Sequence, residues 1–557
     1  MSTTRRIYFY AVTIITLGIF AAGIRNLLAL LFDITIKGSP VVGPDFARQQ
    51  LSLSLAMIII GGPLWFWFWK TVQRYAASND METGAASRKL FLNLVLTATA
   101  LVILFTGRDF LSWLLAGLPQ AQFSSGGLAT LTVAALVWFY HGRISEAEGH
   151  PSSAARTLRR WYVYVLSGWS LVWLATAVVQ IVNISLRSLP IWGDVIVAGE
   201  FWTNSLRNNI ATMAMGTGFW VFHWLRMAEG DLDSTLRQVY LYLLAILNSA
   251  IAGLVAFTTI LYWLFNRAFG GASNVQFLTW TIPMILLTTA IWSYHERLAV
   301  EEAREFDERR FSAQRVHLYL MSLIGLGTMI AGLIALMGIL LDFLINAVST
   351  GPVAVAPGWW RSQLSLSLSL LLVGTPLWLN YWNRILRRVA EGTAIEWAAR
   401  SRRVYLYLVV AAAIITLAAD LVNIVYQALN GLLQTTSVAD VLKKSKWSLQ
   451  TLLIAAPVLL YHLRTVRQDL RRGAEAVAVH KSVTLLVTDG ARDLITQIEG
   501  KLGFRVQVLT ALQQEEMPML SDEELTSLAD NIRAAPGTKV MLVVTGGKII
   551  VTPYESK

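Results

Sequence analysis

The first 470 residues are a succession of long apolar runs separated by short polar segments. Most runs have about 18 to 28 residues, enough for a helix to cross a hydrocarbon core of roughly 30 Å. The pattern predicts twelve membrane-spanning helices, of which the fourth and the twelfth are short. The approximate spans are residues 7–32, 50–69, 90–115, 126–141, 161–186, 208–225, 239–265, 277–294, 316–344, 364–382, 404–429 and 448–462.

Every second span opens with the same short pattern, a basic residue followed by alternating aromatic residues. Three clear copies are Arg6-Ile7-Tyr8-Phe9-Tyr10, Arg160-Trp161-Tyr162-Val163-Tyr164 and Arg403-Val404-Tyr405-Leu406-Tyr407, and weaker copies start at Lys89, Gln238 and Arg315. Each opening helix is followed by a return helix. The repetition predicts six helical hairpins of roughly 80 residues each.

The return helices are of two alternating kinds. Those of the first, third and fifth hairpins end in tryptophan-rich segments, at Trp65, Trp67 and Trp69, at Trp220 and Trp224, and at Trp378 and Trp382. Those of the second, fourth and sixth end in Tyr-His-x-Arg, with the histidines at His141, His295 and His462. Hairpins therefore pair into three four-helix repeats, residues 1–150, 151–310 and 311–475. Because each repeat has an even number of helices, the copies should be parallel rather than inverted.

The composition changes near residue 478, where polar and charged residues become frequent. Residues 481–488 and 504–510 have the pattern of strands, with an amphipathic helix at 491–502 between them. Ser521-Asp522-Glu523-Glu524 is a capping box that opens a second helix to Ala534. Residues 539–545 and 548–552 form a predicted hairpin around Gly546-Gly547. The order β-α-β-α-β-β predicts a small α/β domain over residues 480–557.

The fold class is therefore an all-α polytopic membrane protein with about twelve transmembrane helices, plus a small C-terminal α/β domain. Composition agrees, since 55% of the 557 residues are hydrophobic and 15% are charged, and mean hydropathy is +0.53. Such a chain cannot cover itself with a polar surface as a cytosolic enzyme does. The absence of cysteine excludes thiolate catalysis, disulfides and cysteine-ligated metals.

Lysine and arginine are distributed asymmetrically between the two alternating sets of loops. The set that includes both ends of the membrane region holds about three times as many as the other set. Cytoplasmic loops carry this excess, so both termini are expected in the cytoplasm. The net charge of +11 then belongs to the membrane surface, because the basic residues are scattered over loops rather than gathered for nucleic-acid binding.

The Arg-x-Tyr-x-Tyr openings followed by two-helix hairpins resemble a bacterial family of multi-pass membrane repeats that is known only as a domain of unknown function. The similarity covers residues 5–470. It implies a protein of the bacterial plasma membrane and brings no activity with it.

Ionisable residues within spans are the first candidates for function. Arg25 and Arg108 each lie 19 residues after the basic opening of their helix, or roughly 28 Å along it, near the outer edge of the hydrocarbon. Asp420 lies at a similar depth, with Asn423 one turn further. Asp109 adjoins Arg108, and neighbouring residues point to different sides of a helix. Anchoring or interhelical pairing is the favoured interpretation, and a ligand vestibule is the alternative.

The Tyr-His-x-Arg motifs allow two interpretations. The favoured one is an aromatic and basic belt at the cytoplasmic interface, formed by the motif histidines with Arg143, Arg297 and Arg464, and the tryptophan clusters are interpreted in the same way. The alternative is a metal site made by three imidazoles around a common axis. In the C-terminal domain, Asp489-Gly490 joins a strand to a helix and is a weaker candidate for anion binding.

Two classes of function remain open. The first is a solute transporter or channel-like permease with a cytoplasmic regulatory domain. The second is a membrane scaffold or sensor that organises lipid or partner proteins, with partners docking on the C-terminal domain. No nucleotide-binding or hydrolase motif occurs in the sequence, so neither enzymatic activity nor a cofactor is expected. The expected partners are the lipid bilayer, a small solute or cytoplasmic proteins.

Overall fold

The computed structural model describes residues 2–37, 44–189, 199–232, 234–271, 274–305, 312–348, 358–391, 399–479, 482–487, 492–502, 506–510, 520–536, 539–545 and 548–554. The chain divides into two compact units, Met1–Arg384 and Ile385–Lys557. Long helices dominate the described residues, and a small sheet follows them. Each unit is described by itself below.

The helices of the membrane region follow one another as the apolar runs predict. Their bounds are α1 (Thr3–Ile36), α2 (Pro44–Ser78), α3 (Asp80–Thr83), α4 (Ala86–Leu115), η1 (Gln120–Gln122), α5 (Ser125–Glu148), α6 (Ser153–Arg187), α7 (Gly199–Trp220), η3 (Val221–Met227), α8 (Thr235–Val239), η4 (Tyr240–Ile246), α9 (Leu247–Ala268), α10 (Leu278–Glu305), α11 (Ser312–Val348), α12 (Trp360–Glu391), α14 (Arg400–Leu433) and α15 (Val438–Val479). Here η1 is a 3-10 turn, and η3 and η4 are π-helical segments continuous with their neighbours.

Among the described residues, nine helices are long and apolar enough to cross a membrane. They are α1, α2, α4, α6, the continuous segment Thr235–Ala268, α11, α12, α14 and α15. The remaining three predicted spans coincide with α5, α7 and α10, which are not among the nine. The chain is thus a multi-pass membrane protein by helix length and apolarity, and the number twelve remains a prediction.

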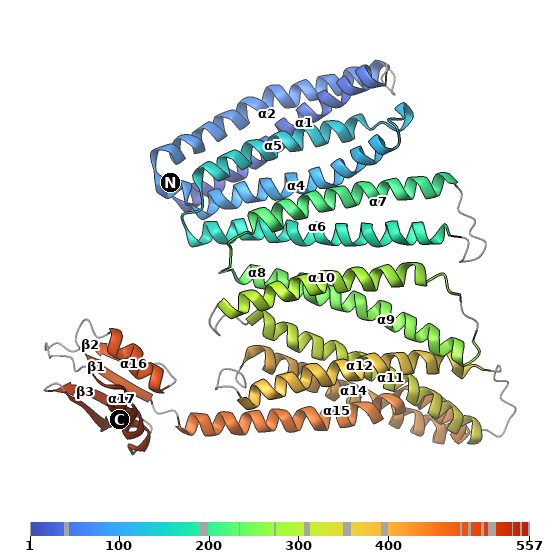
Figure 1. The fold of residues 1–557 in the computed structure, drawn as a ribbon, viewed down its shortest axis with the longest axis vertical. Helices are drawn as coiled ribbons and strands as arrows, with labels where there is room; N and C mark the ends of the chain where they lie inside the picture. The colour runs from blue at the N-terminus through green and yellow to red at the C-terminus, as the bar shows by residue number, and fades with distance from the viewer. Residues whose placement is uncertain are drawn as a thin grey trace. The chain divides into compact units, whose positions relative to one another are not determined.

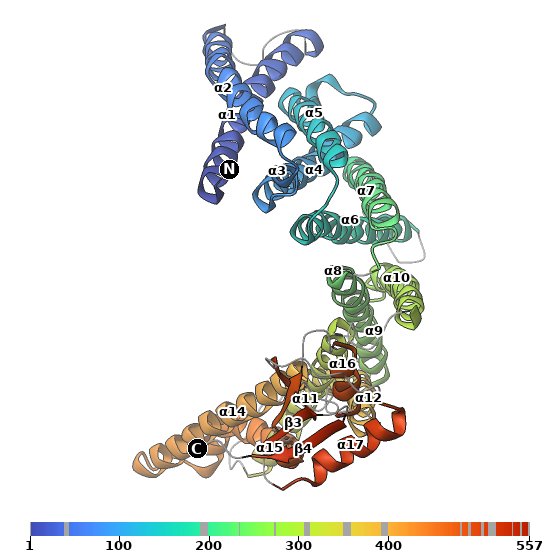
Figure 2. The ribbon, with the colours of Figure 1, turned by 90° about the vertical axis from the view of Figure 1, so that its left-hand side faces the viewer.

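Within the first unit, α1, α2, α4 and α5 lie side by side (Figure 1). Figure 2 shows α6 and α7 beside α4, in agreement with the contacts between these three helices. A buried core joins α4, α6, η3, η4 and α10 near the N-terminal ends of α4 and α6, and it includes Tyr162, Trp224 and Tyr240. Aromatic side chains bury more apolar surface than most others, so this core contributes strongly to helix association.

Small residues bring paired helices close together. The segment Gln-Leu-Ser-Leu-Ser-Leu occurs twice, at Gln50–Leu55 on α2 and at Gln363–Leu368 on α12. Ser54, Ser365 and Ser367 are buried, whereas Ser52 is exposed. The Ser367 hydroxyl on α12 donates to the Gly332 carbonyl on α11 at 2.8 Å. Hydroxyl groups that bond to backbone carbonyls are satisfied without water, which suits helix packing in a membrane.

The C-terminal sheet has four strands in the order β2-β1-β3-β4. Its elements are β1 (Ser482–Val487), α16 (Arg492–Leu502), β2 (Gln507–Thr510), α17 (Asp522–Ala534), β3 (Lys539–Thr545) and β4 (Lys548–Pro553). β1 is parallel to β2 and β3, and β3 is antiparallel to β4. Apolar residues of α16 and α17 pack on alternate residues of β1 and β3, including Val483, Leu485, Val540 and Leu542. The predicted strand and helix order is confirmed, and so is the capping box at Ser521 and Glu524.

Candidate functional site

The most regular feature of the described chain is a buried cluster that occurs three times. In the first copy, the Arg88 guanidinium on α4 bonds to the Glu148 carboxylate on α5, with Arg88 Nε 3.0 Å from both Glu148 oxygens. The Phe91 ring, three residues after Arg88, lies 5.9 Å from the His141 ring. Arg88 also lies over the Trp69 ring on α2, at 5.7 Å from its centroid. We call this group the Arg–carboxylate cluster.

The second copy has the same parts in the same order. Arg237 on α8 bonds to Glu302 on α10, with its Nε 2.9 Å from one carboxylate oxygen, and lies 4.6 Å from the Trp224 ring centroid. Tyr240, three residues after Arg237, lies 5.7 Å from the His295 ring. Its hydroxyl is 3.3 Å from His295 Nε2.

The third copy lies in the second unit, between α14 and α15. Arg402 Nε is 2.7 Å from the Asp469 carboxylate, and the Tyr405 ring lies 6.0 Å from the His462 ring. In all three copies the acid follows the histidine by seven residues and the arginine precedes the aromatic ring by three. The side chains of Arg88, Arg237 and Arg402 are at most 8% exposed. A buried arginine requires a carboxylate partner, which explains the fixed spacing.

The first cluster joins all four long helices of residues 1–150. Besides Glu148 on α5 and Trp69 on α2, Arg88 donates to the Tyr10 hydroxyl on α1 at 3.2 Å and to Gln73 on α2. Lys89 Nζ lies 3.0 Å from the second Glu148 oxygen, so one carboxylate faces two buried cations. The arrangement holds the four helices together through one shared carboxylate.

The first and third hairpins carry a different ion pair, one residue further along. Arg6 pairs with Glu82 at 2.7 Å, and Arg160 pairs with Asp231 at 2.6 Å. The Tyr164 hydroxyl also donates to Asp231 at 2.8 Å. Basic openings of both kinds of hairpin are therefore used to hold helix ends together, in addition to any contact with lipid headgroups.

The electrostatic state of Glu148 follows from its neighbours. Burial by itself raises the pKa of this carboxyl group, but the hydrogen bonds and positive charges of Arg88 and Lys89 outweigh burial and bring the pKa below its usual 4.5. A carboxyl whose pKa is lowered on folding stabilises the fold above its unfolded pKa.

We expect this stabilisation to disappear as the pH falls below about 4.5, through the lower pKa of the folded protein. The melting temperature of the purified chain, measured from about pH 7 down to about pH 3, should fall more steeply than that of the E148Q variant. Parallel curves for the two proteins would show that Glu148 is protonated to the same extent in the folded and unfolded states.

The three motif histidines are buried, and each uses Nδ1 to bond to the carbonyl four residues earlier. The Nδ1-to-oxygen distances are 2.8 Å for His141, 2.8 Å for His295 and 2.9 Å for His462. In the described part of the chain, His141 Nε2 has no hydrogen-bond partner, because Phe91 occupies the place that Tyr240 has beside His295. No group of three metal-ligating side chains occurs among the described residues, so the three-imidazole site finds no support.

The belt interpretation does not fit the histidines, which are buried, and stays a prediction for the tyrosines and arginines of the motifs. The motif tyrosines and Arg143, Arg297 and Arg464 are exposed on the helix surface. The histidines are buried, and so are Trp69, Trp224 and Trp382 of the tryptophan-rich segments. Trp69 Nε1 donates to the Tyr140 hydroxyl at 2.7 Å, and Trp224 Nε1 donates to the Tyr294 hydroxyl at 3.2 Å. An indole with a hydroxyl partner can be buried between helices instead of lying at the lipid interface.

The candidate residues within the predicted spans lie in different surroundings. Arg108 and Asp109 do pair, with Nε to Oδ1 at 2.9 Å, although their positions on the helix point apart. Asp420 is buried and accepts a hydrogen bond from the Thr451 hydroxyl at 2.8 Å, as interhelical pairing predicts, and Asn423 is half-buried on the same helix. Asp489 and Gly490 lie outside the described residues.

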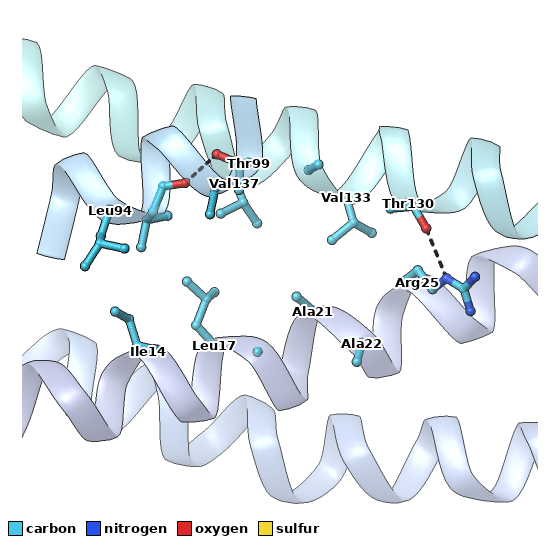
Figure 3. A pocket seen from close by; sticks show the side chains of 14 residues that line it. Ile14, Leu17, Ala21, Ala22, Arg25, Leu94, Thr99, Thr130, Val133 and Val137 are labelled. Carbon is cyan, nitrogen blue, oxygen red and sulfur yellow. Dashed lines mark hydrogen bonds between the residues drawn. The ribbon is translucent and has the colours of Figure 1, made fainter. Parts of the chain in front are cut away.

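Arg25 lines a cavity. The cavity, of about 510 Å³, lies between α1, α4 and α5 (Figure 3). Figure 3 shows Ile14, Leu17 and Ala21 along one wall and Val133 along another, with Arg25 at the end. The full lining is Ile14, Leu17, Gly18, Ala21, Ala22, Arg25, Leu94, Val95, Ala98, Thr99, Thr130, Val133, Ala134 and Val137. We call this cavity the Arg25 groove.

The Arg25 guanidinium donates hydrogen bonds to neutral side chains. Its Nε donates to the Thr130 hydroxyl at 3.1 Å, and its Nη1 donates to the Asn26 side-chain oxygen at 2.8 Å. Within the described residues no carboxylate pairs with it; nearby Asp33 pairs with Lys37 instead. The Arg25 groove therefore combines an apolar lining with the Arg25 guanidinium, whose charge no described carboxylate neutralises.

Sequence reasoning selected Arg25 but missed the Arg–carboxylate clusters and the groove. A signal for the clusters was present, since Glu148, Glu302 and Asp469 each follow a motif histidine by seven residues. Seven residues is close to two helical turns, so histidine and acid share a face. The small residues that form the groove walls come from three helices and leave no local pattern.

Comparison with known families gives one result. Residues 6–125 and residues 315–446 each match the model of a domain of unknown function, DUF5671. The two matches begin at Arg6 and Arg315, which open the first and fifth predicted hairpins. A search of curated proteins and a search of solved structures give no significant match. These two segments therefore match a domain family of unknown function, and the match brings no activity with it.

Proposed function

We propose that this protein is a twelve-span protein of the bacterial plasma membrane that binds an anionic lipid in the Arg25 groove. It belongs to the scaffold or sensor class, in which the membrane region organises lipid. The C-terminal α/β domain lies in the cytoplasm and meets protein partners. The observation that carries the proposal is the apolar groove that ends at an arginine without a carboxylate partner among the described residues.

Three four-helix repeats are part of this proposal. The support comes from the Arg–carboxylate clusters, each of which has an arginine, an aromatic ring, a histidine and an acid at the same spacing. Twelve spans follow if α5, α7 and α10 cross the membrane beside their partners, with which they make extensive contacts. The excess of lysine and arginine in alternate loops supports cytoplasmic termini.

The dimensions and chemistry of the groove favour a lipid over a water-soluble solute. Ile14 and Arg25 are eleven residues apart on α1, so the groove extends about 16 Å along the helix, a length suited to part of an acyl chain. Apart from Arg25, its lining is aliphatic or small, with two threonines. Thr99 satisfies its hydroxyl on the Val95 carbonyl at 2.6 Å, so it offers little to a polar ligand. A polar solute would lose its hydration there without replacement bonds.

Partner binding by the C-terminal domain is supported by the two edges of its sheet. β2 and β4 are edge strands, and they expose Val508, Leu509 and Ile550. Edge strands with exposed apolar residues are suited to pairing with an extended segment of another chain.

Transport is the second candidate, and the same groove supports it. A groove that is open along its side can carry an amphiphile between leaflets, with Arg25 holding the headgroup near one surface. A permease for a small polar solute has less support, because the Arg25 groove offers a single charged side chain.

The test is lipid binding by the purified full-length chain and its R25Q variant. We expect phosphatidylglycerol to bind the native chain about tenfold more tightly than R25Q, because a hydrogen bond to a charged group is worth roughly 1.5–3 kcal/mol. The measurement is native mass spectrometry with graded additions of lipid. The matched control is R108Q, since Arg108 has the equivalent position in the next hairpin and does not line the groove.

Equal binding by the native chain and R25Q would contradict the proposal, as would equal losses in R25Q and R108Q. Ala98 also lines the groove, so A98F should reduce binding by filling it. A second measurement follows a labelled anionic lipid between the leaflets of vesicles that contain the protein. If the native chain transfers the lipid and R25Q does not, the protein is a transporter rather than a scaffold.

A further inference from the structure

A second cavity, of about 570 Å³, lies where α4, α5, α6 and η3 meet. It is close to the first Arg–carboxylate cluster but is separate from it and from the Arg25 groove. Its lining is Asn93, Leu96, Trp138, Phe139, Gly142, Arg143, Ser145, Glu146, His150, Arg159, Tyr162, Phe222, Arg226 and Met227. Three arginines from three different elements and one glutamate belong to this lining. We call it the three-arginine pocket.

The positive charge of this pocket is largely uncompensated. Arg159 Nη2 donates to the Met227 carbonyl at 3.3 Å, a neutral partner. In the described part of the chain, neither Arg143 nor Arg226 forms an ion pair, and Glu146 forms none either. Arg143, Arg226 and Glu146 are exposed and Arg159 is half-buried, so the pocket lining carries three guanidinium groups and one carboxylate. This excess of positive charge favours an anion bound in the pocket.

Two further polar groups define the pocket. His150 has a buried Nε2 without a hydrogen-bond partner among the described residues. Burial, together with the charges of Arg159 and Lys89, lowers the pKa of His150 to about 4, so its imidazole is neutral at pH 7. The Tyr162 hydroxyl is already occupied, because it accepts from Trp138 Nε1 at 3.1 Å and donates to His223 Nε2 at 3.0 Å. His150 Nε2 can therefore form a hydrogen bond with a ligand. The Tyr162 side chain, whose hydroxyl already has two partners, only forms part of the pocket wall.

The pocket contains a departure from the repeat pattern. Residue five of the hairpin opening is tyrosine in five hairpins, namely Tyr10, Tyr164, Tyr242, Tyr319 and Tyr407. The second hairpin has Asn93 at this position. Tyr242, at the same position two hairpins later, lies 6.0 Å from the His317 ring, and His317 is the counterpart of Tyr162. A smaller residue at this one position leaves the space open.

We propose that the three-arginine pocket binds a phosphate group, carried either by an anionic phospholipid or by a soluble phosphate compound. Guanidinium groups bind phosphate through paired hydrogen bonds, and three of them match its several oxygens. His150 adds one more hydrogen bond. Leu96, Phe222 and Met227 provide an apolar wall for the carbon part of the ligand. Basic pockets between membrane helices are suited to lipid headgroups.

The experiment measures binding to the full-length chain in neutral detergent by native mass spectrometry. The probes are phosphatidylglycerol, zwitterionic phosphatidylcholine as the control lipid, and inorganic phosphate. We expect the affinity for the preferred anionic probe to fall about tenfold in R143Q. R297Q is the matched control, because Arg297 has the same place in the next Tyr-His-x-Arg motif and does not line the pocket. N93Y, which restores the residue of the other hairpins, should abolish binding.

The outcomes distinguish a lipid phosphate from a soluble phosphate. They also distinguish binding in this pocket from binding in the Arg25 groove. Binding of phosphatidylglycerol that is lost in R143Q and kept in R297Q supports a lipid ligand, and the same result with inorganic phosphate alone supports a soluble one. The loss should persist in the R25Q background, where the groove is already impaired. Equal effects of R143Q and R297Q would overturn the proposal, and so would full binding by a folded N93Y variant or no binding of either anionic probe.

Discussion

Replacing Glu148 by glutamine should lower the free energy of unfolding by at least about 3–5 kcal/mol, the cost of breaking a buried ion pair. The reason is that Arg88 and Lys89, both fully buried, share this carboxylate. Glutamine can accept a hydrogen bond from one of them but carries no charge. Two buried cations would then face each other without compensation. The measurement is unfolding of the purified chain by a denaturing detergent, followed by circular dichroism.

Two variants test whether this loss comes from the shared carboxylate. E146Q removes a charge two residues earlier, at an exposed position without an ion pair among the described residues, and should change stability by less than about 0.5 kcal/mol. E302Q breaks the second cluster, where the described partner is a single arginine, and should cost less than E148Q. Equal stability of E148Q and E146Q would show that the cluster is hydrated and contributes little.

The sequence predicted the order of the elements well, for physical reasons that are local. Apolar runs of membrane length determine where helices form, and short polar segments determine where they end. In the C-terminal domain, the predicted strand at residues 539–545 and the capping box at Ser521 match the structure. These features depend on neighbours within a few residues, so one sequence is enough to recognise them.

The burial of the motif side chains could not be predicted in the same way. A histidine or tryptophan near a helix end can lie at the lipid interface or pack on another helix, and its own sequence surroundings are alike in both cases. Trp69 is buried because Tyr140 and Arg88, from two other helices, supply a hydroxyl and a cation. The deciding contacts are between residues about 20 to 70 positions apart, which a pattern read along one helix does not contain.

The cavities are still harder to predict from the sequence, because each requires small side chains on several helices at once. The Arg25 groove requires Ala21, Ala98 and Ala134 to face one another from α1, α4 and α5. None of these alanines is unusual in its own helix. Asn93 is different, since it departs from a pattern that the other five openings keep, and comparing repeats within a single chain can reveal such a site.

Close packing of α11 on α12 gives the second large expected effect. A methyl group added at Gly325 on α11 would lie 2.5 Å from the Trp378 backbone nitrogen on α12. Backbone atoms cannot move aside as the end of a side chain can, so the two helices would have to separate. We expect G325A to lower the free energy of unfolding by about 1–3 kcal/mol or more, as overpacking of a tight interior does.

The matched control is G327A, two residues further along the same helix. No heavy atom lies within 4 Å of a methyl group built at Gly327, so alanine there should stabilise the helix by up to about 1 kcal/mol. The two variants have the same composition and differ in which face of α11 carries the added methyl group. Opposite signs in the detergent unfolding experiment would establish the contact between α11 and α12 in the membrane protein. Destabilisation of equal size in both would contradict it, because a general intolerance of alanine in α11 would then account for the effect.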